Sequence, residues 1–160
     1  DRHIPVDAYG TEHDASASLE HSDFSLMRNQ QVSLRKLDSY DIKNVDFIKI
    51  DVEGHEFKVL DGAKTLLKNS KPAILVEIEQ RHCQSPISHT FEFIQKLGYE
   101  GYFLECGQLQ SILRFDLAKD QDPKNLNKAR GNYINNFLFL HNSRVSQGDY
   151  VGLFGAFGKS

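Results

Sequence analysis

Two apolar runs separated by one helix-like segment constrain the fold of this chain more than any other feature. The first run is "VDFIKID" at residues 45–51, and the second is "PAILVEIE" at residues 72–79. Near-continuous apolar runs of this length are typical of strands buried on both faces. Between the runs, spacings of three and four predict one buried face of a helix, made by Phe57, Leu60, Ala63 and Leu67.

The same alternation continues towards the C-terminus. Ser85 and Pro86 predict the start of a second helix, and Gly98 follows its end. Strands are then expected at residues 99–107 and 135–142. Strands that alternate with helices predict an α/β fold with a mostly parallel sheet. No helix is expected between the last two strands, so they are expected to pair antiparallel.

The remaining segments carry weaker patterns. Residues 3–9 predict a short strand, residues 10–31 read as a polar surface loop, and residues 32–40 predict a second strand followed by a turn. The Gly- and Phe-rich C-terminal stretch is expected to be loosely packed. We therefore divide the chain into a domain at residues 1–145 and a flexible tail at residues 146–160.

Composition and charge exclude several classes of function. The net charge is -3 with both signs spread along the chain, so no basic stripe predicts nucleic-acid binding. No apolar run approaches the ~20 residues that a membrane span needs. The two cysteines, Cys83 and Cys106, make neither a disulfide framework nor a zinc site. Reduced thiols favour a cytoplasmic location.

Carboxylates gather where the two apolar runs end. Asp51 and Glu53 lie at the end of the first run, and Glu77 and Glu79 lie near the end of the second. Sites in open α/β sheets form beyond the carboxyl ends of the strands, so these four side chains are expected to share one rim. A lysine inside such a strand is costly unless it is paired, so Lys49 is expected to bond Glu77 or Asp51.

Three interpretations of this carboxylate cluster stay open from the residues alone. It is a functional site with shifted pKa values, or a salt-bridge network that ends a strand and starts a helix. A metal-assisted hydrolase or phosphoryl-transfer site is also possible chemically, because clustered oxygens suit Mg²⁺. Glu53, His55 and Glu56 are, singly, as compatible with a structural role as with a functional one.

At these residues the sequence resembles the signature of the FkbM-type methyltransferases. The resemblance rests on "VDFIKIDVEGHEFKVLDGAKTLL" followed by "KPAILVEIE", with "LRKLDSY" upstream. It covers roughly residues 4 to 105. It implies a Rossmann-like class I methyltransferase sheet, S-adenosylmethionine as cofactor, and methylation of a hydroxyl on a small molecule or glycan. A non-catalytic interaction module on the same scaffold is the alternative of a different class.

The resemblance also implies roles for individual residues. Asp51 would lie near the sulfonium methyl group or orient the acceptor, and Glu53 and His55 would be the candidates for a general base or a substrate ligand. Glu77 and Glu79 would line the acceptor side. Asp7 and Ala8 would be the remnant of the adenine pocket. No metal ligand is implied.

The chain departs from the family pattern in one respect. The Gly-rich cofactor loop and the first strands of the fold are missing from this sequence, because no D-x-G-x-x-x-G run precedes Asp51. The C-terminal "GKS" does not replace that loop, since Leu153 stands where a phosphate-binding loop needs glycine. We expect the chain to be the C-terminal part of a longer enzyme. We also expect the open sheet edge to be covered by residues 11–30, by a missing N-terminal half or by a second subunit.

Overall fold

The computed structural model describes residues 2–6, 28–126 and 133–158. The chain forms two compact units, residues 1–36 and residues 37–160. In the first unit, β1 (Arg2–Val6) pairs antiparallel with β2 (Arg28–Val32). The strand expected at residues 3–9 is therefore present in part, and residues 7–9 lie outside the described residues, as do residues 10–27 of the expected loop. Residues 28–31, also expected to belong to that loop, form most of β2, so the expectation is wrong there.

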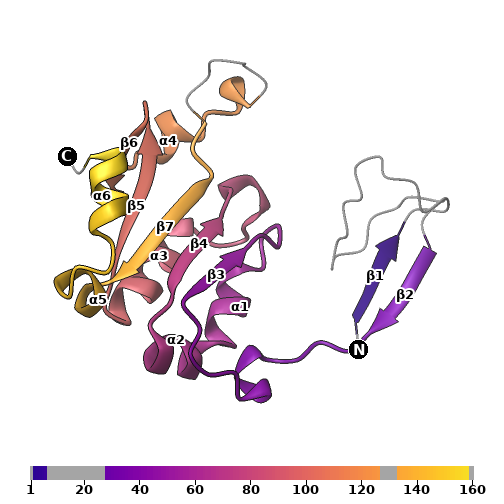
Figure 1. Cartoon of the computed structure of the whole chain (residues 1–160). Coiled ribbons are helices and arrows are strands. Elements are labelled where there is room, and N and C mark those ends of the chain that lie inside the picture. Colours follow the sequence, from indigo (N-terminus) through magenta and orange to yellow (C-terminus); the bar gives the residue numbers. More distant parts are fainter. Residues whose placement is uncertain (1, 7–27, 127–132, 159–160) are drawn as a thin grey trace. The chain divides into compact units, whose positions relative to one another are not determined.

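The second unit carries five strands and a series of short helices among its described residues (Figure 1). The strands are β3 (Phe47–Ile50), β4 (Ala73–Glu77), β5 (Tyr99–Glu105), β6 (Gln108–Ser111) and β7 (Asn136–His141). The α-helices are α1 (Glu56–Asp61), α2 (Lys64–Ser70), α3 (Ile87–Lys96), α4 (Leu117–Asp120), α5 (Asn142–Ser146) and α6 (Val151–Phe157). The 3₁₀ helices are η1 (Leu37–Tyr40), η2 (Gln80–His82), η3 (Ile112–Arg114) and η4 (Pro123–Asn125).

Residues 32–40 were expected to form a strand followed by a turn. The strand is wrong, because β2 ends at Val32, but a turn is present, since residues 37–40 form η1. Asp38 explains why the chain turns here. Its carboxylate accepts hydrogen bonds from the backbone N–H groups of Thr65 and Leu66, at 2.9 and 3.0 Å, in the first turn of α2. The backbone N–H of Asp38 also donates to the carbonyl of Gly62 at 2.9 Å. A side chain that caps a distant helix needs a turn at this point and not an extended strand.

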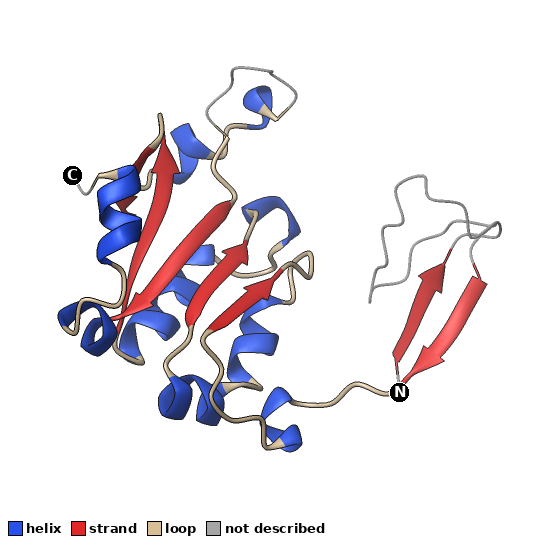
Figure 2. Cartoon of the chain, in the orientation of Figure 1, coloured by secondary structure: helices blue, strands red, loops and turns tan. Residues whose placement is uncertain are grey.

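The five strands form one mixed sheet in the order β3-β4-β7-β5-β6 (Figure 2). Only β3 and β4 pair parallel, while β4–β7, β7–β5 and β5–β6 pair antiparallel. The expectation of a mostly parallel sheet is therefore wrong, and the antiparallel pairing of the last two expected strands is confirmed. The α/β class holds. Because β4 and β5 both run opposite to β7, the strands β3, β4 and β5 still point in one direction.

The hairpin that adds β6 to the sheet is not predicted by the sequence pattern. Cys106 and Gly107 connect β5 to β6 with positive φ angles of 50° and 77°. Two consecutive residues with positive φ make the tight turn whose twist suits a two-residue hairpin. These two turn residues lie inside the strand expected at residues 99–107, so β5 ends two residues earlier, at Glu105.

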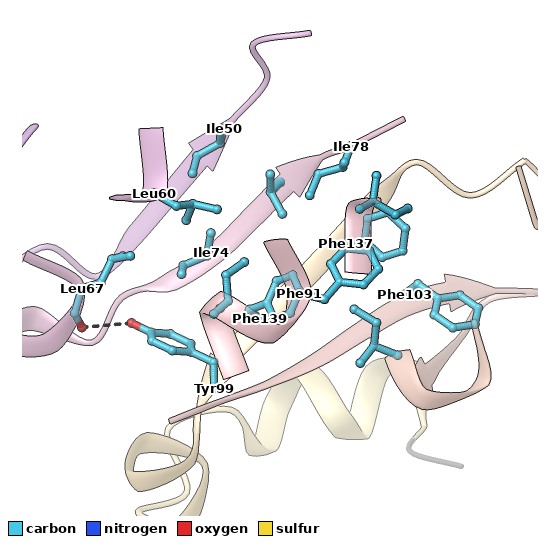
Figure 3. Packing of buried hydrophobic residues seen from close by; sticks show 14 of the residues in the cluster. Ile50, Leu60, Leu67, Ile74, Ile78, Phe91, Tyr99, Phe103, Phe137 and Phe139 are labelled. Atoms are coloured by element: carbon cyan, nitrogen blue, oxygen red, sulfur yellow. Dashed lines mark hydrogen bonds between the residues drawn. The ribbon is translucent and has the colours of Figure 1, made fainter. Parts of the chain in front are cut away.

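The main core lies between the sheet and the helices α1, α2 and α3 (Figure 3). Period-two alternation sends Ile74 and Val76 of β4 into this core, and both are fully buried. Phe91 of α3 packs against Phe137 and Phe139 of β7 with ring centroids 4.8 and 5.9 Å apart. The phenol of Tyr99 donates to the carbonyl of Leu67 at 3.2 Å, which satisfies the polar end of a buried ring.

A smaller core lies on the opposite face of the sheet. Ala73, Tyr102, Leu109 and Leu140 form its buried centre. The stretch at residues 146–160, expected to be a flexible tail, contains α6, and Leu153 and Phe154 of that helix pack against this second core. The Gly- and Phe-rich stretch thus contains a helix that packs one side against the sheet.

The strand β3 lies at the edge of the sheet. Its Phe47 is 54% exposed, although an aromatic side chain in a strand is usually buried against a neighbour. Within the described residues, no strand pairs with the outer side of β3. What covers this edge stays a prediction.

Candidate active site

The carboxyl ends of β3 and β4 lie side by side, as the sequence analysis expected. Ile50 faces Val76 in the parallel register, so Asp51 and Glu77 directly follow a paired position. The Nζ of Lys49 lies 2.9 Å from Oδ2 of Asp51, which confirms that this lysine bonds one of the two expected carboxylates. This hydrogen bond raises the pKa of Lys49, which therefore stays charged.

The turn after β3 is held in an unusual backbone conformation. Glu53 has φ at 43° and Gly54 has φ at 91°. Left-handed φ is uncommon for a residue with a side chain and costs of order 1–3 kcal/mol. A Cβ atom at Gly54 would stand 2.2 Å from the carbonyl oxygen of His82, so only glycine fits there. This close approach joins the turn after β3 to the segment after β4.

His55 and Glu56, which follow this turn, are buried. Their exposed fractions are 8% and 2%. Oε1 of Glu56 accepts a hydrogen bond from the backbone N–H of Gly54 at 2.8 Å, and the thiol of Cys83 lies 4.0 Å from Oε2. Burial and the charge of Glu56 raise the pKa of Cys83 to about 11. Cys83 is therefore a protonated thiol at neutral pH and a poor nucleophile.

Glu77 is half-buried at the end of β4. The side-chain amide of Asn135 donates to its Oε1 at 2.7 Å. Burial raises the pKa of Glu77, and the negative charges of Asp51 and Glu79 raise it further, while Lys49 opposes them. Glu77 is thus a carboxylate whose charged form is disfavoured by its surroundings.

Glu79 is bound by stronger hydrogen-bond partners than Glu77. Nε of Arg81 lies 2.7 Å from its Oε2, and the hydroxyl of Tyr133 donates to the same oxygen at 2.6 Å. Burial alone would raise the pKa of Glu79, but the hydrogen bonds from Arg81 and Tyr133 outweigh it, and the pKa is lowered. Burial and the bond to Glu79 raise the pKa of Tyr133 to about 12. Glu79 is therefore a firmly ionised carboxylate.

A buried glutamine fixes the backbone beneath these carboxylates. The amide of Gln121 donates to the carbonyls of Ile78 and Ile134 at 2.7 and 2.9 Å. Its carbonyl oxygen accepts from the backbone N–H of Gln80 at 2.8 Å. Gln121 is only 7% exposed, so these three bonds satisfy it where water has little access. It links the segment before β7 to the end of β4.

The structure therefore places the predicted site residues in two groups. Asp51, Glu53, Glu77 and Glu79 lie along one rim, and the negative charges of Asp51, Glu79 and Glu53 all raise the pKa of Glu77. His55 lies beside them in sequence but is buried at the start of α1. Asp7 and Ala8, the expected adenine-pocket residues, lie outside the described residues.

Sequence reasoning missed Arg81, Tyr133 and Asn135, which bond the carboxylates, and Gln121, which fixes the backbone beneath them. Arg81 lies two residues after Glu79 and could have been found by charge complementarity. Tyr133 and Asn135 are 54 and 58 residues away from their partners. The only local signal was the polar flank of the expected strand at residues 135–142, which does not name a partner.

The part of the chain that the structure describes contains no group of three His, Cys, Asp or Glu side chains able to hold a metal ion. Nothing in the structure therefore supports the hydrolase alternative. A cavity of about 500 Å³ lies at the other end of β3, between η1, residues 41–46, α2 and Arg144. It contains none of the predicted site residues, so the candidate site is the open rim and not this cavity.

Comparison with known families identifies the class of protein. The family of the methyltransferase FkbM domain matches residues 2–101, from β1 through the first residues of β5. This chain belongs to the FkbM methyltransferase domain family. Searches of curated proteins and of solved structures found no match. Among the described residues, no helix is long and apolar enough to cross a membrane.

Proposed function

We propose that this protein transfers a methyl group from S-adenosylmethionine to a hydroxyl of a small molecule or glycan. The family match indicates a methyltransferase in general, and the carboxylate rim supports the finer assignment. The matched residues include both strand ends that carry Asp51, Glu53, Glu77 and Glu79. The main support for the proposal is that the region matched by the family contains all four carboxylates of the rim.

The strand directions support the proposal of a Rossmann-like sheet. β3, β4 and β5 run in one direction, and helices α1, α2 and α3 connect them along the same core face. The exposed Phe47 on the edge strand fits a sheet that continues beyond β3. We propose that residues outside this sequence, or a second copy of the chain, cover this edge, and that the protein is cytoplasmic.

The residues of the rim fit a cationic cofactor. S-adenosylmethionine supplies a methyl group on a positively charged sulfonium, and carboxylates stabilise positive charge nearby. Asp51, at the end of β3, is the residue of the described rim that would face it. Asp7 and Ala8 would contribute to the adenine pocket, as the resemblance implies.

The charges of the rim also restrict the acceptor. Asp51, Glu53, Glu77 and Glu79 give four negative charges against Lys49 and Arg81. A phosphorylated or carboxylated acceptor would be repelled from this rim, whereas neutral hydroxyl groups can donate to carboxylate oxygens. Methyl transfer depends mainly on positioning, and a base assists when the nucleophile is a neutral hydroxyl.

A labelled-methyl assay tests this proposal. The protein that carries this chain is incubated with methyl-labelled S-adenosylmethionine and a panel of neutral glycosides and small alcohols. Matched phosphorylated glycosides serve as controls. We expect label in a neutral acceptor, with formation of S-adenosylhomocysteine, and little in the phosphorylated controls. Preferred labelling of the phosphorylated acceptors, or transfer only to nitrogen or carbon nucleophiles, would overturn the assignment.

A further inference from the structure

Two side chains of the segment before β7 reach the carboxylates at the end of β4. Ile134 is buried, with only 6% exposed, and its N–H donates to the carbonyl of Asp120 at 2.8 Å. Its neighbours Tyr133 and Asn135 donate to Glu79 and Glu77 at 2.6 and 2.7 Å. The N–H of Ile78 also donates to the carbonyl of Asn135 at 2.8 Å. This segment is thus fixed by its backbone, so its side chains hold a defined position.

The two carboxylates are held in different ways. Glu79 is neutralised by Arg81 and also receives the Tyr133 hydroxyl, so it has a cation and a neutral donor. Glu77 receives one neutral donor, on Oε1 only. Within residues 28–126 and 133–158, no hydrogen bond engages its Oε2. Glu77 is half-buried, so its unengaged oxygen can meet a ligand at the rim.

Asn135 is itself oriented by a neighbour. The amide of Asn136 donates to Oδ1 of Asn135 at 2.9 Å. With its carbonyl oxygen engaged in this way, the Asn135 side chain presents its N–H₂ group to Glu77 and not its oxygen. The hydrogen bond from Asn136 to Asn135 therefore fixes which side-chain atom of Asn135 meets the Glu77 carboxylate.

We propose that Glu77 accepts the proton of the acceptor hydroxyl through Oε2, and that Asn135 is a positioning residue that holds Oε1 and aims Oε2 at the acceptor. This inference rests on the proposed function and deepens it. In the step, the bond from the acceptor oxygen to the methyl carbon forms as the sulfur–methyl bond breaks. The hydroxyl proton moves to Glu77, and the thioether leaves neutral.

The electrostatic surroundings of Glu77 suit a proton acceptor better than those of the other rim residues. Asp51 and Lys49 face it from β3, while Glu79 and Glu53 add negative charge from the strand ends. Glu79 is held ionised by Arg81 and is a weak base. Asp51 is bound to Lys49. His55 is buried at the start of α1.

The test follows Glu77 directly by carboxyl ¹³C NMR of the protein labelled at glutamate, assigned with Glu77→Gln. The variants are Asn135→Ala, the isosteric Asn135→Asp, and Asn142→Ala as an exposed control on α5. An N–H donor to a carboxylate favours the charged form, so removing it raises the pKa of Glu77. We expect a clear upward shift in Asn135→Ala, a larger one in Asn135→Asp, and none in Asn142→Ala.

Kinetics with a neutral glycoside acceptor complete the test. The acid limb of kcat against pH should move upward by the same amount as the pKa measured by NMR, because the base must be deprotonated. At neutral pH, kcat should fall about tenfold with KM nearly unchanged, as expected for an effect on proton transfer. Thermal unfolding, measured in parallel, identifies any variant that is merely unstable.

Three results would overturn the inference. They are an unchanged Glu77 titration in both Asn135 variants, an acid limb that does not follow the titration, and a Glu77→Gln variant with wild-type kcat. Failure of the wild-type protein to bind S-adenosylmethionine by calorimetry would instead count against the proposed function. The role in transfer would fall with it, while the titration would still decide whether Asn135 holds Glu77.

Discussion

The turns that follow β3 and β4 make up one rim, but they are built on different principles. The turn after β3 is defined by its own backbone, with left-handed φ at Glu53 and Gly54 and a buried Glu56 that accepts the Gly54 N–H. After β4 the backbone is extended at Glu79 and then turns in η2. The carboxylates of this strand end are held by the nearby Arg81 and by two side chains from far along the chain, Tyr133 and Asn135. The hydrogen bond within the first turn is therefore local, whereas two of the three partners at the second strand end depend on the completed tertiary fold.

The largest effect is expected from a substitution that disrupts the turn after β3. Gly54→Ala places a Cβ atom against the carbonyl of His82 and forces left-handed φ on alanine, so we expect a loss of about 3 kcal/mol or more in unfolding free energy. Gly107→Ala is the matched control, because its φ is also positive but nothing lies within 4 Å. It should cost about 1 kcal/mol. Equal losses in chemical denaturation would show that the close approach does not matter.

The second largest effect is expected from a substitution that removes the hydrogen bonds supporting the segment after β4. Gln121→Ala leaves the carbonyls of Ile78 and Ile134 and the N–H of Gln80 without their partner. Unsatisfied buried groups predict a loss of about 2–3 kcal/mol in unfolding free energy. Gln95→Ala, at an exposed position of α3, should stay within about 0.5 kcal/mol of the wild type. A loss in Gln121→Ala no larger than in this control would contradict the structural link.

A smaller effect concerns pH. Tyr133→Phe removes one donor to Glu79 and should cost about 1 kcal/mol at pH 7. The folded pKa of Glu79 is lowered, so its stabilisation is present above the ordinary value of 4.5 and is lost as pH falls through the folded pKa. The difference between wild type and Tyr133→Phe should therefore shrink on acidification below that range. Denaturation at several pH values measures it, and a constant difference would mean that Glu79 is not the partner that matters.

The smallest effect is expected from a substitution at Glu53, which separates the cost of its left-handed backbone from its role in methyl transfer. Glu53→Gly relieves left-handed φ on a residue with a side chain, so unfolding free energy should rise by about 0.5 kcal/mol. If Glu53 serves the proposed site, methyl transfer should fall while stability rises. A variant that gains stability and keeps full activity would make Glu53 a structural position only.

The local parts of this molecule could be predicted from the sequence. The buried runs that became β3 and β4 and the approximate position of α3 follow from periodicity and helix-start residues. The pairing of Lys49 with a carboxylate follows from the cost of an unpaired charge. These conclusions depend on neighbours within a few positions, where sequence spacing translates directly into geometry.

The parts of the molecule that depend on residues far apart in the sequence could not be predicted. Nothing in the sequence indicates that β7 enters the sheet between β4 and β5, and this placement makes the β4–β7 and β7–β5 pairs antiparallel. The same placement brings Tyr133 and Asn135 to Glu79 and Glu77. The single helix predicted between the two apolar runs also divides at Gly62 and Ala63 into α1 and α2, since Asp38 caps the second segment from a distance.

Calorimetric titration of S-adenosylmethionine into the protein that carries this chain tests the central claim most directly. The variants are Asp51→Asn and the matched Asp61→Asn, since Asp61 is also a half-exposed aspartate paired with a lysine, at 3.0 Å. The account predicts binding by the wild type, at least about tenfold weaker binding by Asp51→Asn, a change of about 1.4 kcal/mol, and unchanged binding by Asp61→Asn. No binding by the wild type, or equal binding by all three proteins, would contradict it.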